Sequence, residues 1–122
     1  MREIKFRAWD KERKEMSEPF EVLSLGIPFR DGNTRYLYFD ENPLMQFTGL
    51  GDAKGIEIYE GDILRQFPGF GCAWEERTGI VKYAGASFWF DMGTQAFILD
   101  DHDCRFEVIG NLYENPELKE GL

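Results

Sequence analysis

The residues best suited to chemistry form one run, Asp100-Asp101-His102-Asp103-Cys104, which holds the only histidine of the sequence. Imidazole and carboxylate groups bind divalent metals and transfer protons. Consecutive residues of an extended chain point to opposite sides, however, whereas the ligands of a metal must converge. The run therefore favours a solvated acidic loop, and a metal-dependent enzyme centred on residues 100–104 stays an alternative.

Nucleophilic catalysis would need a cysteine beside His102 as its base. Cys104 is too close to His102 in the sequence for an easy approach along a strand, and Cys72 would have to be brought near by the fold. Two cysteines at this separation form neither a disulfide framework nor a zinc signature, so we expect free thiols, with Cys104 a buried filler. Residues 69–74, GFGCAW, lack the third glycine of a dinucleotide fingerprint, and no G-K-[ST] sequence marks a P-loop. We expect no catalytic residue, metal or cofactor.

Aromatic side chains offer a binding role instead. Phe70 and Trp74 lie in a loop whose Pro68 and glycines argue against a central strand. Trp89 lies between two phenylalanines, and strand alternation aims it opposite to both. Aromatic rings are enriched at the centres of protein interfaces, whereas burial of these rings over the core is the alternative. The candidate interaction surface is therefore Phe70, Trp74 and Trp89.

The charge of the chain is acidic and uneven. The net charge is −9, with +2 on residues 1–16 and −11 on the rest. This disfavours direct nucleic-acid binding, which depends on Lys and Arg, and suggests as an alternative an acidic decoy that binds a basic host DNA-binding protein. The longest uncharged segment, residues 42–51, is shorter than the roughly 20 apolar residues of a membrane span. The charged N-terminal segment lacks the apolar run of a secretory signal, so we expect a cytoplasmic protein.

Short segments with two-residue alternation predict an all-β fold. In residues 3–9, Ile4, Phe6 and Ala8 share one side, and the aromatic residues 36–39 predict another strand. From residue 44 onward the strand candidates follow at the close spacing of a small barrel. Asn115-Pro116-Glu117 then predicts a single helical turn. The expected core is Ile56, Ile58, Ile63, Ile80, Val81, Phe106, Val108 and Ile109.

Three blocks of sequence carry a family resemblance. They are MREIKFRAWD at the start, LMQFTGLGDAKGIEIYEGDIL at 44–64 and VIGNLYENPEL at 108–118. Their order and co-occurrence resemble the YopX-like proteins of phages and prophages. The resemblance implies a mainly β fold with a small SH3-type barrel or roll, a phage or prophage origin, and no established activity. All three blocks can be explained as structural, since their glycines and apolar residues suit turns and a core.

Together these observations predict one domain over residues 1–122. It would comprise an N-terminal β extension (1–43), a barrel core (44–113) and a C-terminal turn and tail (114–122). The expected function is a non-enzymatic module that binds a host or phage protein or assembles with itself, because edge strands and aromatic patches must be covered.

Overall fold

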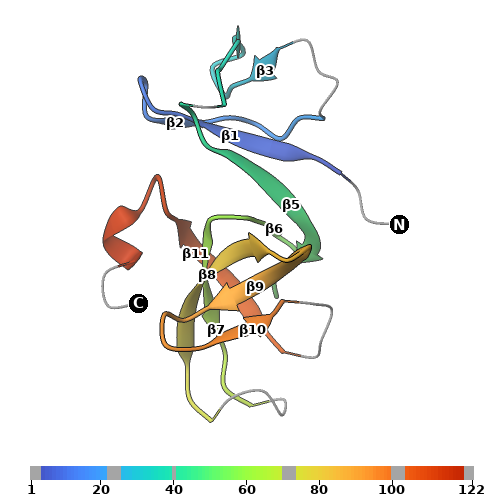
Figure 1. Cartoon of the computed structure of the whole chain (residues 1–122), viewed down its shortest axis with the longest axis vertical. Helices are drawn as coiled ribbons and strands as arrows, with labels where there is room; N and C mark the ends of the chain where they lie inside the picture. Colours follow the sequence, from blue (N-terminus) through green and yellow to red (C-terminus); the bar gives the residue numbers. More distant parts are fainter. Residues whose placement is uncertain (1–3, 22–25, 40, 70–73, 100–103, 120–122) are drawn as a thin grey trace.

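The computed structural model describes residues 4–21, 26–39, 41–69, 74–99 and 104–119. Within these ranges the chain forms eleven strands and one 3-10 turn. The strands build an N-terminal lobe and, beside it, a curled sheet, which one long strand connects (Figure 1). The predicted all-β class is confirmed, and the curled sheet is a half-barrel. No helix in the described ranges is long and apolar enough to cross a membrane.

The half-barrel is a five-stranded antiparallel sheet. Its strands are β7 (Asp62–Gln66), β8 (Arg77–Ala84), β9 (Ser87–Asp91), β10 (Ala96–Ile98) and β11 (Phe106–Asn111). Their order is β10-β9-β8-β7-β11, so β10 and β11 are its margins. The sheet curls far enough that Phe106 of β11 meets Phe90 of β9 edge-on, with ring centroids 5.0 Å apart.

The main core fills the concave face of this sheet. Gly79 on β8 is needed there, because a Cβ at that position would lie 2.8 Å from Cε1 of Phe90 and from the carbonyl oxygen of Asp91. The missing side chain lets the Phe90 ring lie against β8. The buried members of this core are Ile58, Leu64, Val81, Phe88, Phe90 and Leu99.

The predicted core was largely confirmed. Ile58, Ile63, Ile80 and Val81 are buried, whereas the prediction for Ile56 was wrong, since that side chain is 50% exposed. Ile56 precedes its strand and closes a turn with Asp52: its carbonyl accepts the backbone N–H of Asp52, and its own N–H donates to the carboxylate Oδ1 of Asp52. The remaining three, Phe106, Val108 and Ile109, are partly buried on the marginal strand β11.

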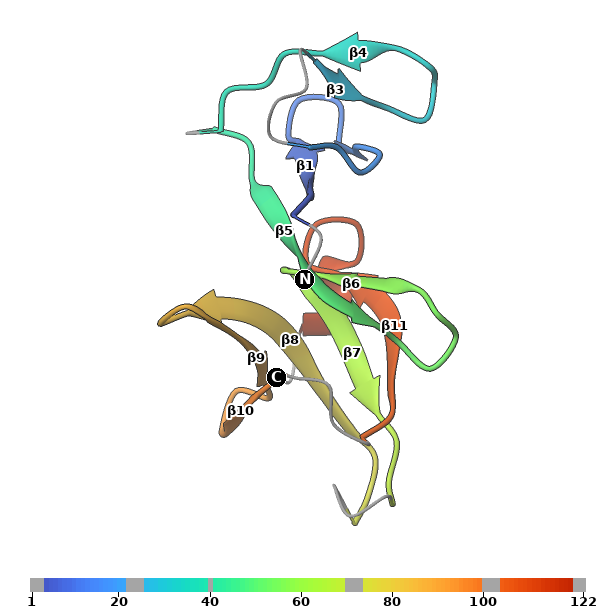
Figure 2. The ribbon, with the colours of Figure 1, turned by 90° about the vertical axis from the view of Figure 1, so that its right-hand side faces the viewer.

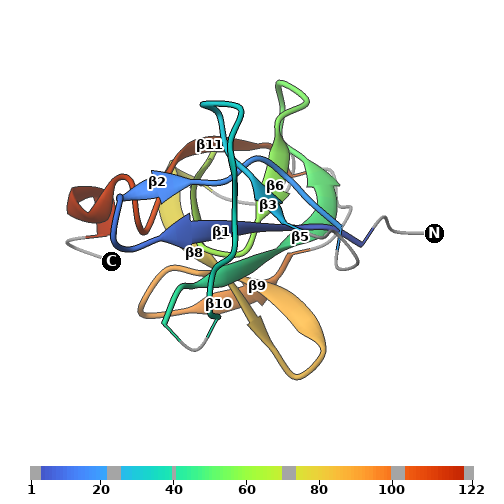
Figure 3. The same ribbon diagram turned by 90° about the horizontal axis from the view of Figure 1, so that it is seen from above.

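The N-terminal lobe surrounds a second, smaller sheet with the order β2-β1-β5-β6. These strands are β1 (Phe6–Asp10), β2 (Glu15–Met16), β5 (Leu44–Gly51) and β6 (Glu57–Tyr59). A separate pair, β3 (Ile27–Pro28) and β4 (Thr34–Arg35), lies at the far end of the lobe (Figure 2). Strand β5 runs from the lobe down to the half-barrel, and β1 and β5 cross above the barrel strands (Figure 3).

Both faces of β1 are covered, which differs from the half-buried strand predicted there. Ala8 packs into a small cluster with Ile27 and Phe29, while Trp9 packs on the opposite side with Met16 and Met45. One face of β1 therefore packs against the apolar cluster of the lobe, and the other face packs toward the half-barrel.

The predicted strand at residues 36–39 was wrong. These residues connect β4 to β5, and no described strand pairs with them. Leu37 packs against the lobe cluster, but Tyr36 and Tyr38 are 81% and 76% exposed. Aromatic residues favour strands where a pleated neighbour can cover them, and here none does.

Two C-terminal predictions had different outcomes. The turn predicted after Asn115 is present as η1 (Pro116–Lys119), and the backbone N–H of Leu118 donates to the carbonyl of Asn115. The free thiol predicted at Cys104 was wrong, since this residue is half-buried and disulfide-bonded. Cys72 lies outside the described residues.

Candidate interaction surface

The two predicted surface residues that the structure describes, Trp74 and Trp89, lie apart. Phe70 lies outside the described residues. Trp74 is fully exposed, three residues before β8 begins, whereas Trp89 is half-buried on β9 and its Nε1 donates to the carbonyl of Ala84 at 2.9 Å. Trp89 pairs with Lys82, which lies five residues beyond the first residue of β8, or roughly 17 Å along the strand. The two indoles therefore belong to different ends of the sheet.

Trp89 does take part in a surface row across the open margin of the sheet. Its direct partners are Lys82 on β8 and Ile98 on β10, so the three side chains share one face. Ile98 is 52% exposed. On the other face Phe97 pairs with the buried Phe90 and is 46% exposed. Strand β10 therefore shows large apolar side chains on both faces.

The backbone of β10 is also open on its outer side. The N–H of Leu99 donates to the carbonyl of Phe88, and the N–H of Met92 donates to the carbonyl of Gln95. Because hydrogen-bonded pairs alternate in antiparallel strands, Phe97 turns its backbone groups toward β9. Ala96 and Ile98 turn theirs outward, where no described strand lies. Figure 2 shows β10 at the margin of the half-barrel.

A second feature is the junction where the lobe meets the half-barrel. Arg7 of β1 donates from Nη2 to Oδ1 of Asp62 on β7 at 2.6 Å, and its guanidinium lies 4.8 Å from the ring centroid of Tyr59. Asp62 is 1% exposed, and its Oδ2 accepts the backbone N–H of Tyr59 at 2.7 Å. The Nε of Arg7 is buried without a hydrogen-bond partner. The junction thus holds a buried ion pair with incomplete hydrogen bonding.

Burial dominates the electrostatics of this junction. It raises the pKa of Asp62, and the opposing effects of Arg7 and of the Tyr59 N–H do not cancel it. Burial also raises the pKa of Glu60. The pKa of Tyr113 is raised by burial and by the charge of Glu60. The junction therefore favours uncharged side chains, which makes the ionised Asp62 costly to keep.

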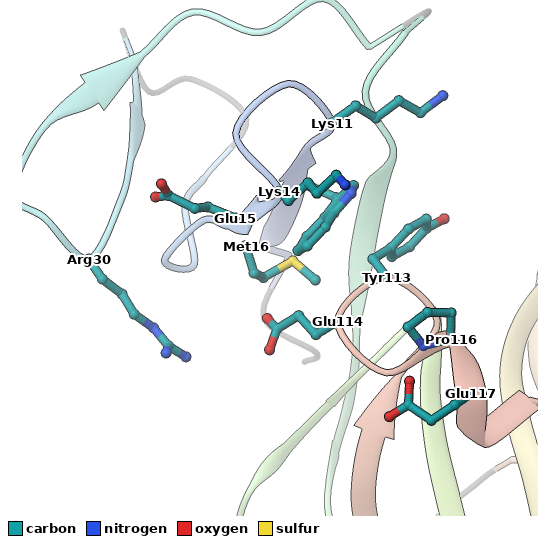
Figure 4. A pocket seen from close by; sticks show the side chains of 10 residues that line it. Lys11, Lys14, Glu15, Met16, Arg30, Tyr113, Glu114, Pro116 and Glu117 are labelled. Atoms are coloured by element: carbon teal, nitrogen blue, oxygen red, sulfur yellow. The ribbon is translucent and has the colours of Figure 1, made fainter.

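A groove of about 810 Å³ lies between the lobe and the C-terminal turn (Figure 4). Trp9 and Tyr113 form part of its lining, and their rings stack with centroids 5.9 Å apart. Lys11 and Lys14 come from the β1–β2 hairpin, whereas Glu114 and Glu117 come from the C-terminal turn. Charges of both signs line the groove, so it has no marked preference for an anionic or a cationic ligand.

The three blocks of the family resemblance meet at this junction. Arg7 and Trp9 come from the first block, Tyr59 and Asp62 from the second, and Tyr113 from the third. Sequence reasoning explained the blocks by turns and core packing and missed the ion pair. The local pattern held no signal for it, because Arg7 shares a side of its predicted strand with Lys5 and Asp62 lies in a predicted turn.

Four residues of the predicted chemical cluster, 100–103 with His102 among them, lie outside the described residues. Among the residues that the structure does describe, no group of three His, Cys, Asp or Glu side chains could hold a metal ion.

The half-barrel and its covering lobe define a small all-β protein. Residues 5–120 match the family model described as "YopX protein", and the chain belongs to the YopX family. The crystal structure of protein EF1440 from Enterococcus faecalis is similar, with a TM-score of 0.60 and 30% sequence identity over 98% of this chain and 100% of that chain. No curated protein matches the chain.

Proposed function

We propose that the chain is a non-enzymatic protein-binding module that pairs an extended segment of a protein partner with the open edge of β10. The observation that carries the proposal is the uncharged, apolar edge strand, whose Ala96 and Ile98 turn their backbone groups outward. In strand addition, backbone hydrogen bonds supply affinity and the alternating side chains supply specificity.

The sequence of β10 supports this role, because it lacks features by which natural sheets block pairing at an exposed edge strand. Charged side chains, especially Lys, and Pro or bulges commonly block such edges. Residues 94–99, TQAFIL, contain neither a charge nor a proline, and the β9–β10 register has no shift. Phe97 and Ile98 would contact the partner on opposite faces of the extended sheet.

A displayed library of random peptides tests the proposal without a known partner. We expect enriched peptides to carry alternating apolar residues. Their affinity should fall at least about tenfold for Ile98→Lys. Ile56→Lys is the matched control, since Ile56 is 50% exposed and Ile98 52% exposed. Failure to enrich any peptide, or equal loss in both variants, would contradict the proposal.

The second candidate, an acidic decoy for a basic host protein, draws on the −11 net charge of residues 17–122. Its binding would weaken as salt rises, because screening reduces attraction between exposed charges. Binding that salt leaves unchanged rules out the decoy. The metal-dependent alternative centred on residues 100–104 is tested by His102→Ala together with calorimetry of divalent metals.

We further propose a phage or prophage origin and a place in the cytoplasm of the bacterial host. The disulfide at Cys104 bears on this location, because disulfides seldom persist in a reducing compartment. Labelling of Cys104 by maleimide added at lysis, without a reductant, would support the cytoplasm. Labelling of Cys104 that requires prior reduction would instead place the protein in an oxidising compartment.

A further inference from the structure

We propose that one occupant of the β10 edge is a second copy of this chain. The inference rests on the proposed function and names its partner. Two β10 strands would pair antiparallel about a two-fold axis that passes beside Phe97, which joins two half-barrel sheets into one continuous sheet. A two-fold contact of this kind uses the same surface on both copies and closes after two.

The backbone of β10 is self-complementary in this register. With Phe97 opposite Phe97 of the partner copy, Ala96 lies opposite Ile98 of the partner copy. Ala96 and Ile98 are the residues whose backbone groups turn outward, as the bonds of Leu99 and Gln95 to β9 require. Each Ala96–Ile98 pair exchanges two N–H to carbonyl bonds, so both outward donors and both outward acceptors of each strand are used.

The side chains complement one another in the same register. Phe97 pairs with Phe90, so the inner face gains a continuous row of Phe90 and Phe97 from each copy. The two Phe97 residues form the close, non-hydrogen-bonded type of pair, in which aromatic side chains contact best. On the outer face, Ile98 lies beside the small Ala96 of the partner copy. The exposed apolar surface of Phe97 and Ile98 is thereby covered.

The charges predict how strong this contact is and how it responds to salt. The charged group nearest the axis is the guanidinium of Arg77, which lies 5.3 Å from the ring centroid of Phe97, whereas Lys82 and Asp91 form an ion pair at 2.7 Å within one copy. Repulsion therefore comes from the two Arg77 groups and from the net charge of −9 on each copy, and added salt should screen both. Because β10 has three residues, the contact is small, which places the dimer in the weak, concentration-dependent class.

Sedimentation of the full chain tests the dimer. From about 10 μM to about 1 mM protein, the mass should rise from monomer toward dimer. It should rise at lower concentration in about 500 mM than in about 50 mM salt. Ala96→Pro removes an outward N–H without touching the core and should weaken association about tenfold or more. Ile56→Lys should leave association unchanged, and circular dichroism confirms that both variants fold.

A cysteine at the axis tests the register. Phe97→Cys should form a covalent dimer under mild oxidation, with a peptide that joins the two introduced cysteines, because such pairs meet disulfide geometry. Ala96→Cys, which lies opposite Ile98, should form none with itself. A wild type that stays monomeric at about 1 mM in both salts, or a Phe97→Cys chain without that peptide, overturns the dimer. Peptide enrichment would then still decide the proposed function separately.

Discussion

The half-barrel and the N-terminal lobe are held together by different forces. The half-barrel encloses six buried apolar side chains in one core. The lobe has a cluster of Ala8, Ile27 and Phe29, and beside it the buried Asp10 pairs with Arg35 at 3.0 Å. Arg35 also pairs with Glu15 and Asp31 and lies over the Phe29 ring. The apolar cluster of the lobe is small, so charged networks complete its packing.

This difference explains where the molecule is expected to open first. The half-barrel depends on apolar burial, which salt and pH change little. The lobe meets it through the Arg7–Asp62 pair and the Trp9–Tyr113 stack. Ion pairs lose hydration when they are buried, so they hold two parts in register without adding much stability. The lobe should therefore detach under milder conditions than those that unfold the half-barrel.

The largest expected effect comes from a matched pair of Phe→Ala substitutions. Phe90→Ala should lower the free energy of unfolding by about 4 kcal/mol, because a buried ring leaves a cavity. Phe29 is 3% exposed and Phe90 1%, so Phe29→Ala removes a similar ring from the lobe. Hydrogen exchange should show faster exchange of lobe amides for Phe29→Ala with little change in β7–β9. Equal loss of protection in β7–β9 would show that the two parts unfold as one.

The second largest effect is expected from replacement of Arg7, the cation of the junction. Arg7→Met should cost about 3 kcal/mol, because Asp62 is then left as a buried charge without its partner. The double variant Arg7→Met/Asp62→Asn should recover most of this loss, since its amide still accepts the Tyr59 N–H and carries no charge. Urea unfolding measures all three proteins. A double variant as unstable as Arg7→Met would show that packing, not charge, holds the junction.

A smaller effect is expected at Asp52, whose side chain links the turn before β6 to strand β11 at the margin of the half-barrel. Its Oδ1 accepts the N–H groups of Lys54 and Ile56, and its Oδ2 accepts that of Val108 at 3.0 Å. Asp52→Ala should cost about 1.5 kcal/mol. Asp52→Asn keeps one acceptor oxygen and should cost less. Equal loss of thermal stability in the two variants would mean that the oxygen kept by Asn contributes nothing.

Alternation of apolar residues predicted the half-barrel better than the lobe. Ile63, Ile80 and Val81 were placed correctly because each lies in a regular strand with neighbours on both sides. The aromatic run at 36–39 failed because strand propensity depends on a neighbouring strand, which the local sequence does not show. The lobe's packing depends on contacts such as Arg35 with Asp10, which are 25 residues apart.

The candidate surface shows a similar limit. Strand candidate 94–99 was predicted, but its place at the margin of the sheet depends on the order of all five strands. An edge strand and a central strand with the sequence AFI look alike until that order is known. The Arg7–Asp62 pair joins residues 55 positions apart, and strand alternation does not indicate which distant strand a side chain faces.

The smallest expected effect is a pH dependence that separates the junction from the rest. Burial raises the pKa of Asp62 above its usual value near 3.8, so the folded protein binds more protons there than the unfolded chain. The contribution of Asp62 to the free energy of unfolding is therefore present at low pH and is lost as the pH rises through the raised pKa. Asp52 has the opposite sign. Burial raises its pKa, but the N–H groups of Val108, Ile56 and Lys54 outweigh that and lower it below 3.8.

Comparison of the wild type with Asp62→Asn isolates the contribution of Asp62 to the pH dependence of the free energy of unfolding. The stability of the wild type relative to Asp62→Asn should fall as the pH rises above 3.8, because the unfolded carboxyl ionises there before the folded one and the amide does not ionise. Asp52 stays ionised in both proteins there, so it cancels. Urea unfolding at several pH values measures the difference. A difference that grows with pH would mean that Arg7 stabilises the carboxylate more than burial penalises it, and the lobe would then be attached by attraction between the charges.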